Sequence, residues 1–172
     1  ANVVLVYNGA NTLEMGFVND YPQIKSVIWC PGTGQTGFNA LGEIVAGEVN
    51  PSGHSADTFV YDLTAAPYFN NIGDFAYTNA DSVGYTVASQ AGGDAKLVPP
   101  HFVNYVEGIY VGYKFYETAA AEGLIDYDKT VQYPFGHGLS YTTFTQKIDS
   151  MTEADGTITL DVTATNTGSV AG

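Results

Sequence analysis

The sequence predicts an α/β domain followed by a short all-β segment, and three observations point to this fold class. Between residues 26 and 61, a short apolar run, a glycine-rich turn, a helix-like repeat and an extended run follow one another. A second helix-like pattern occupies residues 104–123. After residue 144, apolar and polar residues alternate instead, as in strands with one covered face. This change predicts a boundary between residues 1–140 and residues 141–172.

Strands are predicted near both ends of the chain. The β-branched run Val3–Tyr7 predicts a buried strand, and residues 12–21 predict an irregular or short helical connection that Pro22 closes. The alternating run at residues 157–165 predicts another strand, and the sequence supplies none after it. Unpaired strands leave backbone N–H and C=O groups without partners, so we expect both to pair with, or pack on, polypeptide outside this chain. The chain is therefore predicted to be a segment of a larger protein.

The middle of the chain has the pattern of strand, turn, helix and strand. Val27–Cys30 is a continuous apolar run that predicts a strand buried on both faces. Apolar residues from Phe38 to Val49 then repeat at helical spacing. Gly47 predicts a left-handed cap at the helix end, and Gly37 is predicted to let the helix approach the sheet. Asp57–Tyr61 predicts the next strand, so the whole is typical of a βαβ unit.

The second half of the predicted α/β domain is less regular. Residues 62–101 are rich in turns, and their short alternations predict a hairpin or a long surface excursion. Residues 104–117, with a tail that stops at Gly123, predict a helix with four side chains on one face: Tyr105, Ile109, Tyr113 and Tyr116. Two glycines and a proline in residues 133–144 predict a fixed bend before a strand over residues 144–148.

Composition and charge exclude several classes of function. Hydrophobic residues make up 45% of the chain, which excludes general disorder. No apolar run reaches the roughly 18 to 20 residues of a membrane span, so no membrane partner is predicted. Eighteen acidic against five basic residues give a net charge of −13, which repels phosphate backbones and disfavours nucleic acid. The single cysteine, Cys30, excludes an internal disulfide and leaves the compartment open.

Three motifs carry a resemblance to a known family. They are PGTGQTGFNALGEIVAGEVNPSG at residues 31–53, YVEGIYVGYKFYE at residues 105–117 and YPFGHGLSYTTF at residues 133–144. In this order they resemble the C-terminal half of glycoside hydrolase family 3, the β-glucosidase and β-xylosidase group. The resemblance implies a partial α/β/α sandwich over residues 1–140, then the linker and first strands of a fibronectin type III-like sandwich over residues 141–172. His54 and Ala56 replace the family's usual basic residue and proline, which leaves the sugar open.

The resemblance also implies a chemistry, which is hydrolysis of terminal, non-reducing β-linked sugars with retention by two carboxylates. In the family the nucleophilic Asp belongs to the barrel domain, and the acid/base Glu lies upstream of the strand matched by Val3–Tyr7. We therefore expect no catalytic, metal or cofactor-binding residue here, and no catalytic role for Glu14, Glu43, Glu48 or Glu107. The implied partners are the remainder of the same enzyme and its carbohydrate substrate, and a homo-oligomer is left open.

Other chemistry-bearing side chains have structural interpretations. Glu43 and Glu48 fall on the exposed side of the predicted helix, and Glu107 is expected to hold a backbone N–H or a neighbouring motif. His137 lies between two glycines without an accompanying Ser or Cys nucleophile, so a structural hydrogen bond is expected. The remaining two histidines, His54 and His101, show no metal-ligand spacing.

Two apolar residues and three glycines complete the candidates. Trp29 could stack on a sugar, but its place in a buried strand favours a core position, as for Cys30. The glycines at positions 32, 34 and 37 lack the lysine and the spacing of a phosphate loop.

Two functions of different classes stay open. One is a segment of a retaining exo-acting β-glycosidase whose catalytic pair lies elsewhere in the same protein. The other is a non-catalytic carbohydrate-binding or scaffold module with the same sandwich fold. A barrel aspartate and an upstream glutamate in the same protein would favour the enzyme.

Overall fold

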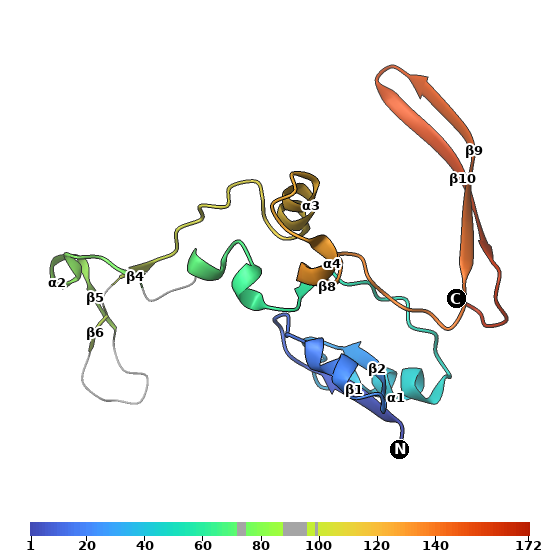
Figure 1. Ribbon diagram of the computed structural model, residues 1–172, viewed down its shortest axis with the longest axis horizontal. Helices are drawn as coiled ribbons and strands as arrows, with labels where there is room; N and C mark the ends of the chain where they lie inside the picture. The colour runs from blue at the N-terminus through green and yellow to red at the C-terminus, as the bar shows by residue number, and fades with distance from the viewer. Residues whose placement is uncertain (72–74, 88–95, 99) are drawn as a thin grey trace. The chain divides into compact units, whose positions relative to one another are not determined.

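The computed structural model describes residues 1–71, 75–87, 96–98 and 100–172 (Figure 1). The chain divides into two compact units with separate packing. Unit 1 comprises residues 1–12, 17–57 and 134–172, and unit 2 comprises residues 13–16 and 58–133. Among the described residues, no helix combines the length and the apolar character that a membrane crossing requires.

Unit 1 contains a parallel pair of strands. β1 (Val3–Tyr7) pairs with β2 (Ile24–Trp29), and the connection between them includes the 3₁₀ helix η1 (Gly16–Asp20). The predicted first strand and its short helical connection are therefore confirmed. The predicted burial is wrong, because the valines at positions 3, 4 and 6 are 39% to 43% exposed and residues 27–30 are only half-buried. Each strand has one neighbour in its described sheet, so a two-stranded pair cannot bury both faces.

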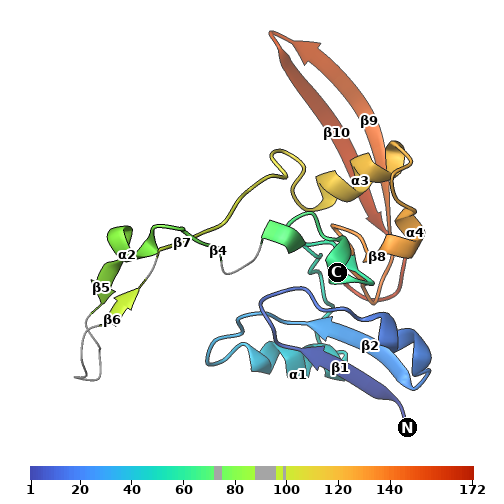
Figure 2. The ribbon, with the colours of Figure 1, turned by 60° about the vertical axis from the view of Figure 1, so that its left-hand side comes forward.

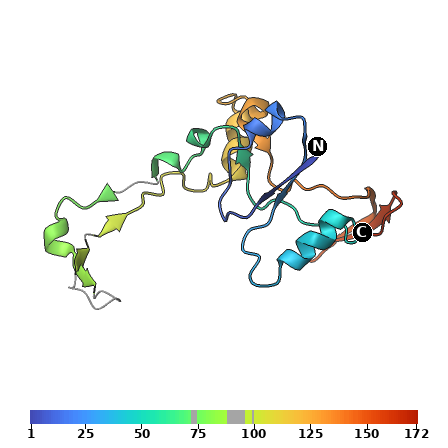
Figure 3. The same ribbon diagram turned by 90° about the horizontal axis from the view of Figure 1, so that it is seen from below.

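The helix α1 (Phe38–Ala46) lies next to the β1–β2 pair (Figures 2 and 3). It ends at Gly47, whose φ of 78° is left-handed. The N–H of Gly47 donates to the carbonyl of Ile44 at 2.9 Å, and that of Glu48 donates to the carbonyl of Glu43 at 2.9 Å. This arrangement satisfies carbonyls that the helix end would leave without partners, and it confirms the predicted cap.

Gly37 has a different role from the one expected. A Cβ on Gly37 would clash with the carbonyl oxygen of Thr33, so the crowding comes from the preceding turn and not from the sheet. The residue has ordinary helical dihedral angles, φ −63° and ψ −22°. A larger residue at position 37 is therefore excluded by the backbone of the preceding turn.

The prediction of a βαβ unit over residues 26–61 is wrong. β3 (Phe59–Val60), the strand after α1, pairs antiparallel with β8 (Val131–Tyr133) in unit 2 and does not join β2. Periodicity locates strands, but it carries no information about which distant strand supplies the hydrogen-bond partner. The parallel pair of this chain is instead β1 with β2.

Replacing Gly47 with alanine is expected to destabilise the protein by about 1 kcal/mol, because an L side chain is strained at positive φ. A Cβ at Gly47 would meet nothing within 4 Å, so the cost is conformational and not steric. Gly42, inside α1, has equally open surroundings and no positive φ. Gly42→Ala should stabilise by about 0.5 to 1 kcal/mol. Chemical denaturation of both variants checks this pair, and a stabilising Gly47→Ala would contradict it.

Unit 2 is built around a small apolar core. Val60 of β3, Val131 of β8 and Tyr116 are buried together. Four partly buried side chains pack against this cluster: Leu63, Phe115, Ile125 and Tyr127. Two short 3₁₀ helices, η2 (Leu63–Ala65) and η3 (Phe69–Asn71), follow β3, and two helices precede β8, α3 (Tyr113–Ala121) and α4 (Tyr127–Thr130).

Only the second half of the helix predicted over residues 104–117 forms. α3 begins at Tyr113, so Tyr105 and Ile109 lie outside it and do not share a helical face with Tyr116. Gly108 and Gly112 have φ of 58° and 60°, which a right-handed helix cannot include. The predicted stop is confirmed: Gly123 has φ 70° and follows the last turn.

The turn-rich segment forms paired short strands, which confirms the hairpin prediction. β4 (Phe75–Ala76) pairs antiparallel with β7 (His101–Phe102), and β5 (Tyr85–Val87) pairs antiparallel with β6 (Lys96–Val98) (Figure 2). The short helix α2 (Ala80–Val83) lies between β4 and β5. One of the short alternations in the sequence is Tyr85–Ala88, and its last residue, Ala88, is outside the described residues.

The chain continues into a long antiparallel hairpin. β9 (Phe144–Ala154) and β10 (Thr157–Asn166) confirm the two predicted strands and exceed the predicted lengths (Figure 1). Asp155 and Gly156, both with positive φ, form the tight turn between them. Asp149 has no partner in the register, so the strand bulges there.

Candidate functional site

Two loops of unit 1 hold each other in a clasp, defined here as residues 50–55 with residues 134–141. The N–H of Ser55 donates to the carbonyl of His137 at 2.8 Å, and the N–H of Gly136 donates to the carbonyl of Ser55 at 2.7 Å. The second loop is the bend predicted from its glycines and proline, and the N–H of His137 closes it onto the carbonyl of Pro134 at 3.0 Å. The clasp therefore joins two of the three motifs described above.

Asn50 is the polar centre of the clasp. Its Oδ1 accepts from the N–H of Tyr141 at 2.8 Å, and its Nδ2 donates to Oγ of Ser140 at 2.9 Å and to the carbonyl of Ala171 at 3.3 Å. The Tyr141 hydroxyl donates to the carbonyl of Ile44 at 2.7 Å, near the end of α1. One amide side chain and one phenol thus fix the bend to the helix end.

A cavity of about 320 Å³ adjoins the clasp. Its lining includes Pro51, Leu139 and Phe144, together with the imidazole of His54. The Nδ1 atom of His54 lies 2.9 Å from the carbonyl oxygen of Ser52. No aspartate, glutamate or cysteine belongs to the described lining, which does include Ser52, Ser140 and His54. The Ser140 hydroxyl is bonded to the Asn50 amide and the His54 Nδ1 atom to the Ser52 carbonyl, so neither contact pairs a hydroxyl with the imidazole as a nucleophile and base.

Three glutamates of unit 2 accept structural hydrogen bonds. Glu14 accepts from the N–H of Leu63 at 2.6 Å, and Glu117 accepts from the Tyr127 hydroxyl at 2.7 Å. Glu107 accepts from Nδ2 of Asn71, which is 5% exposed. A bond from a buried amide to a carboxylate is charge-assisted. Each of these carboxylates therefore holds a neighbouring segment of the fold.

Two phenols near the core of unit 2 titrate late. Burial raises the pKa of Tyr116 from 10.0 to about 12, and the neighbouring Tyr68 acts in the same direction. Burial also raises the pKa of Tyr127 to about 12, with a further contribution from the hydrogen bond to Glu117. In both cases the surroundings favour the neutral phenol over the phenolate.

These shifts predict a loss of stability in alkali. A raised folded-state pKa means that the stabilisation is complete below pH 10 and is lost as the pH rises through 10 to 12. Tyrosinate absorbance should show late ionisation of Tyr116 and Tyr127, and the free energy of unfolding should fall over the same interval. Tyr116→Phe should lessen that fall, because it removes one ionising group. Ionisation of Tyr116 and Tyr127 near pH 10 would contradict the prediction.

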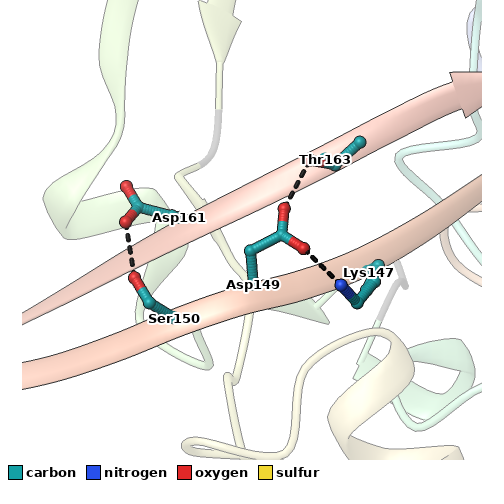
Figure 4. Close-up of polar contacts among 5 residues, drawn as sticks. All are labelled: Lys147, Asp149, Ser150, Asp161 and Thr163. Carbon is teal, nitrogen blue, oxygen red and sulfur yellow. Dashed lines mark hydrogen bonds and ion pairs between the residues drawn. The ribbon is translucent and has the colours of Figure 1, made fainter.

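The β9–β10 hairpin carries a polar network on one face (Figure 4). The ammonium of Lys147 donates to Asp149 at 2.7 Å, Thr163 donates to the same carboxylate, and Ser150 donates to Asp161. The bond from Lys147, followed by that from Thr163, lowers the pKa of Asp149. The network joins side chains of the two strands next to the bulge. It has the form of a cross-strand contact.

The other candidates belong to different elements of the chain. Glu43 and Glu48 are exposed, and His101 lies in β7. Trp29 is half-buried, and its Nε1 donates to the carbonyl of Gly9 at 2.8 Å. Cys30 is also half-buried. Within the part of the chain that the structure describes, no three His, Cys, Asp or Glu side chains gather in a group that could hold a metal ion.

Sequence reasoning missed the two asparagines that organise these contacts. In the sequence Asn50 opens the turn-forming run Asn50-Pro51-Ser52-Gly53, and Asn71 belongs to the turn-rich residues 62–101. Their partners lie far along the chain, at Ser140 and Glu107, so no local pattern marks them.

The comparisons with known proteins agree with the motifs. The family described as "Glycosyl hydrolase family 3 C-terminal domain" matches residues 1–113. Thermostable beta-glucosidase B of Acetivibrio thermocellus is 32% identical over all of this chain, and a beta-glucosidase of Ruminococcus albus is 29% identical over all of it. The chain spans only 19% and 15% of the length of these two relatives.

Two solved structures have the same fold. A beta-glucosidase from Paenibacillus barengoltzii matches 97% of this chain, with a TM-score of 0.71 and 28% identity. Beta-glucosidase 3B from Thermotoga neapolitana matches 99% of it, with a TM-score of 0.69 and 27% identity. This chain corresponds to 15% and 20% of those two proteins. With its first 113 residues matching that family model, the chain belongs to glycosyl hydrolase family 3 and carries sequence of its C-terminal domain.

Proposed function

We propose that the chain is part of a retaining, exo-acting β-glycosidase that releases terminal, non-reducing β-linked glucose. The observation that carries the proposal is the match of the whole chain to proteins named beta-glucosidase, together with the family match over residues 1–113. In this proposal the chain frames the active site, and the catalytic Asp and Glu belong to the remainder of the same enzyme. The engaged glutamates of unit 2 support such a structural role.

The domain organisation is proposed in the same terms. Residues 1–140 would belong to an α/β/α sandwich and residues 141–172 to the linker and first strands of a fibronectin type III-like domain. The hairpin supports this second assignment, because one of its faces is apolar and exposed: Phe144, Ile148, Met151, Ile158, Leu160 and Val162. An antiparallel sheet with one apolar and one polar face is the unit from which β-sandwiches are built.

The test compares the whole protein with this chain alone. The whole protein should hydrolyse a nitrophenyl β-glucoside with retention, whereas residues 1–172 alone should show no turnover. Turnover by the chain alone would place catalytic carboxylates within it and contradict the proposed division of labour. A whole protein that folds, binds sugar and never hydrolyses it would instead be the non-catalytic carbohydrate-binding or scaffold module.

A further inference from the structure

The residues that follow β10 fold back as a strap, defined here as residues 167–172. The N–H of Thr167 donates to the carbonyl of Thr143 at 2.8 Å, and the hydroxyl oxygens of these two threonines lie 2.8 Å apart. The N–H of Gly168 donates to Oδ1 of Asn166 at 3.0 Å, which turns the chain just after β10. The strap therefore starts beside the residues that lead into β9.

Two side-chain amides hold the far part of the strap. The Nδ2 atom of Asn166 donates to the carbonyl of Val170 at 2.8 Å, and Nδ2 of Asn50 donates to the carbonyl of Ala171 at 3.3 Å. The two acceptors are consecutive along the chain, whereas the donors come from different places, because Asn166 ends β10 and Asn50 belongs to the clasp. One amide thus bonds the strap to the hairpin, and the other bonds it to the clasp.

The strap packs closely against Thr142. This residue is 6% exposed, and its hydroxyl donates to Oδ1 of Asn166 at 2.6 Å. A Cβ on Gly168 would clash with that hydroxyl, and a Cβ on Gly172 would clash with Nδ2 of Asn50. Neither glycine has a left-handed φ, so close approach is the reason that each position is restricted to glycine. The strap is therefore in packed contact with the base of the hairpin as well as hydrogen-bonded to it.

We propose that the strap locks the base of the β9–β10 hairpin to the clasp, and that the N–H groups of Asn50 and Asn166 keep it closed. The hydrogen bonds between the two loops of the clasp and those of the β9–β10 register do not involve the strap, so its opening breaks neither set. An open strap would let the hairpin turn about residues 140–144 while both parts stay folded. This inference concerns orientation within unit 1, and it does not rest on the proposed function.

Asn50→Asp tests the bond between the strap and the clasp alone. A carboxylate at this position still accepts from the N–H of Tyr141 and from the hydroxyl of Ser140, as Oδ1 of Asn50 does at 2.8 and 3.1 Å. It has no N–H to donate to the carbonyl of Ala171. The clasp therefore keeps its partners, and the strap loses one.

Asn166→Asp makes the matching change on the side of the hairpin. Its carboxylate still accepts from the hydroxyl of Thr142 and from the N–H of Gly168. It can no longer donate to the carbonyl of Val170. Asn39→Asp, at an exposed position of α1, adds the same charge outside the strap and the clasp, so it serves as the control.

The first measurement is cleavage of the whole protein by elastase, which cuts after small side chains, at residues 170–172. Each of the two strap variants should be cut there about two- to tenfold faster than the wild type, because opening the strap breaks one net hydrogen bond fewer. The double variant should show the product of the two factors, since both amides hold the same segment. Asn39→Asp should be cut at the wild-type rate.

The second measurement is the orientation of the hairpin. Spin labels are placed on cysteines that replace Glu43 in α1 and Glu153 in β9, both exposed, with Cys30 changed to serine. The Tyr141 hydroxyl bonds the end of α1 to the clasp, so the distance between the labels reports how the hairpin lies on the clasp. The distribution of distances should be broader in the double aspartate variant than in the wild type.

The outcomes decide the inference whether or not the protein hydrolyses a glucoside, so its failure is distinct from failure of the proposed function. Wild-type cleavage rates in both strap variants overturn it, and so does a double variant that is cut no faster than the single ones. Cleavage spread along the chain with a lower melting temperature means that the protein unfolds as a whole, which also overturns it, as does an unchanged distribution of distances. Circular dichroism shows which variants fold, and Asn166→Asp decides alone if Asn50→Asp does not fold.

Discussion

Tyr116→Ala is expected to lower the free energy of unfolding by about 3 to 5 kcal/mol, the cost of removing a large ring from a packed core. Tyr116 is 3% exposed and lies in the core of unit 2 with Val60 and Val131. Its ring also meets that of Phe115 edge to face, with centroids 5.3 Å apart. Truncation removes the ring that packs on Val60 and Val131, and the loss depends on how far the surrounding side chains close over the cavity.

The matched control is Tyr105→Ala, which removes the same side chain from a position that is 77% exposed. It should change stability by no more than about 0.5 kcal/mol. Thermal melting measures the stability of both variants, and hydrogen exchange of the β8 and α3 amides measures the local loss in unit 2. Equal losses from the two would place the rings on one buried helical face, as the spacing of residues 104–117 had predicted.

Gly138→Ala is expected to destabilise the clasp of unit 1 by about 2 to 3 kcal/mol through overpacking. A Cβ at Gly138 would clash with the carbonyl oxygen of Gly53 and lie 2.9 Å from Cδ2 of His54. The first of these contacts is with backbone, which cannot rotate away. Relief would require the two loops to separate, which weakens the bonds between Ser55 and the bend.

Gly53→Ala provides the comparison within the same clasp. A Cβ at Gly53 would meet nothing within 4 Å, and its φ is not in the left-handed region. This variant should be neutral or stabilise the protein by up to about 1 kcal/mol. Exchange of the Gly136 amide reports the clasp directly. If that amide exchanges no faster in Gly138→Ala than in the wild type, the close approach does not hold the loops.

Local features of the fold could be predicted from the sequence because their causes are local. The cap at Gly47, the stop at Gly123 and the two strands of the final hairpin follow from nearby glycines and from alternation. The first half of the helix over residues 104–117 was predicted wrongly for the same reason. Its apolar spacing fitted a helix, while two glycines adopted the positive φ that ends one.

Features that depend on distant partners could not be predicted. β3 pairs with β8 and not with β2, although Val60 and its partner Val131 lie 71 positions apart, and no short sequence pattern records this pairing. The contacts of Asn50 with Ser140 and of Asn71 with Glu107 likewise join segments 90 and 36 residues apart. Motif resemblance identified the family because it compares long stretches at once, but it does not say which side chain holds which loop.

The bulge at Asp149 determines which side chains of β9 lie on the same face of the final hairpin. Ile148 and Met151 are three positions apart, so strict alternation would point them to opposite sides. The register pairs them with Val162 and Leu160, which are two positions apart on β10 and share a side. One additional residue therefore brings two apolar segments of β9, out of step in the sequence, onto a common surface. Side chains of β9 therefore do not alternate between the two faces without interruption. The alternation shifts by one residue at Asp149.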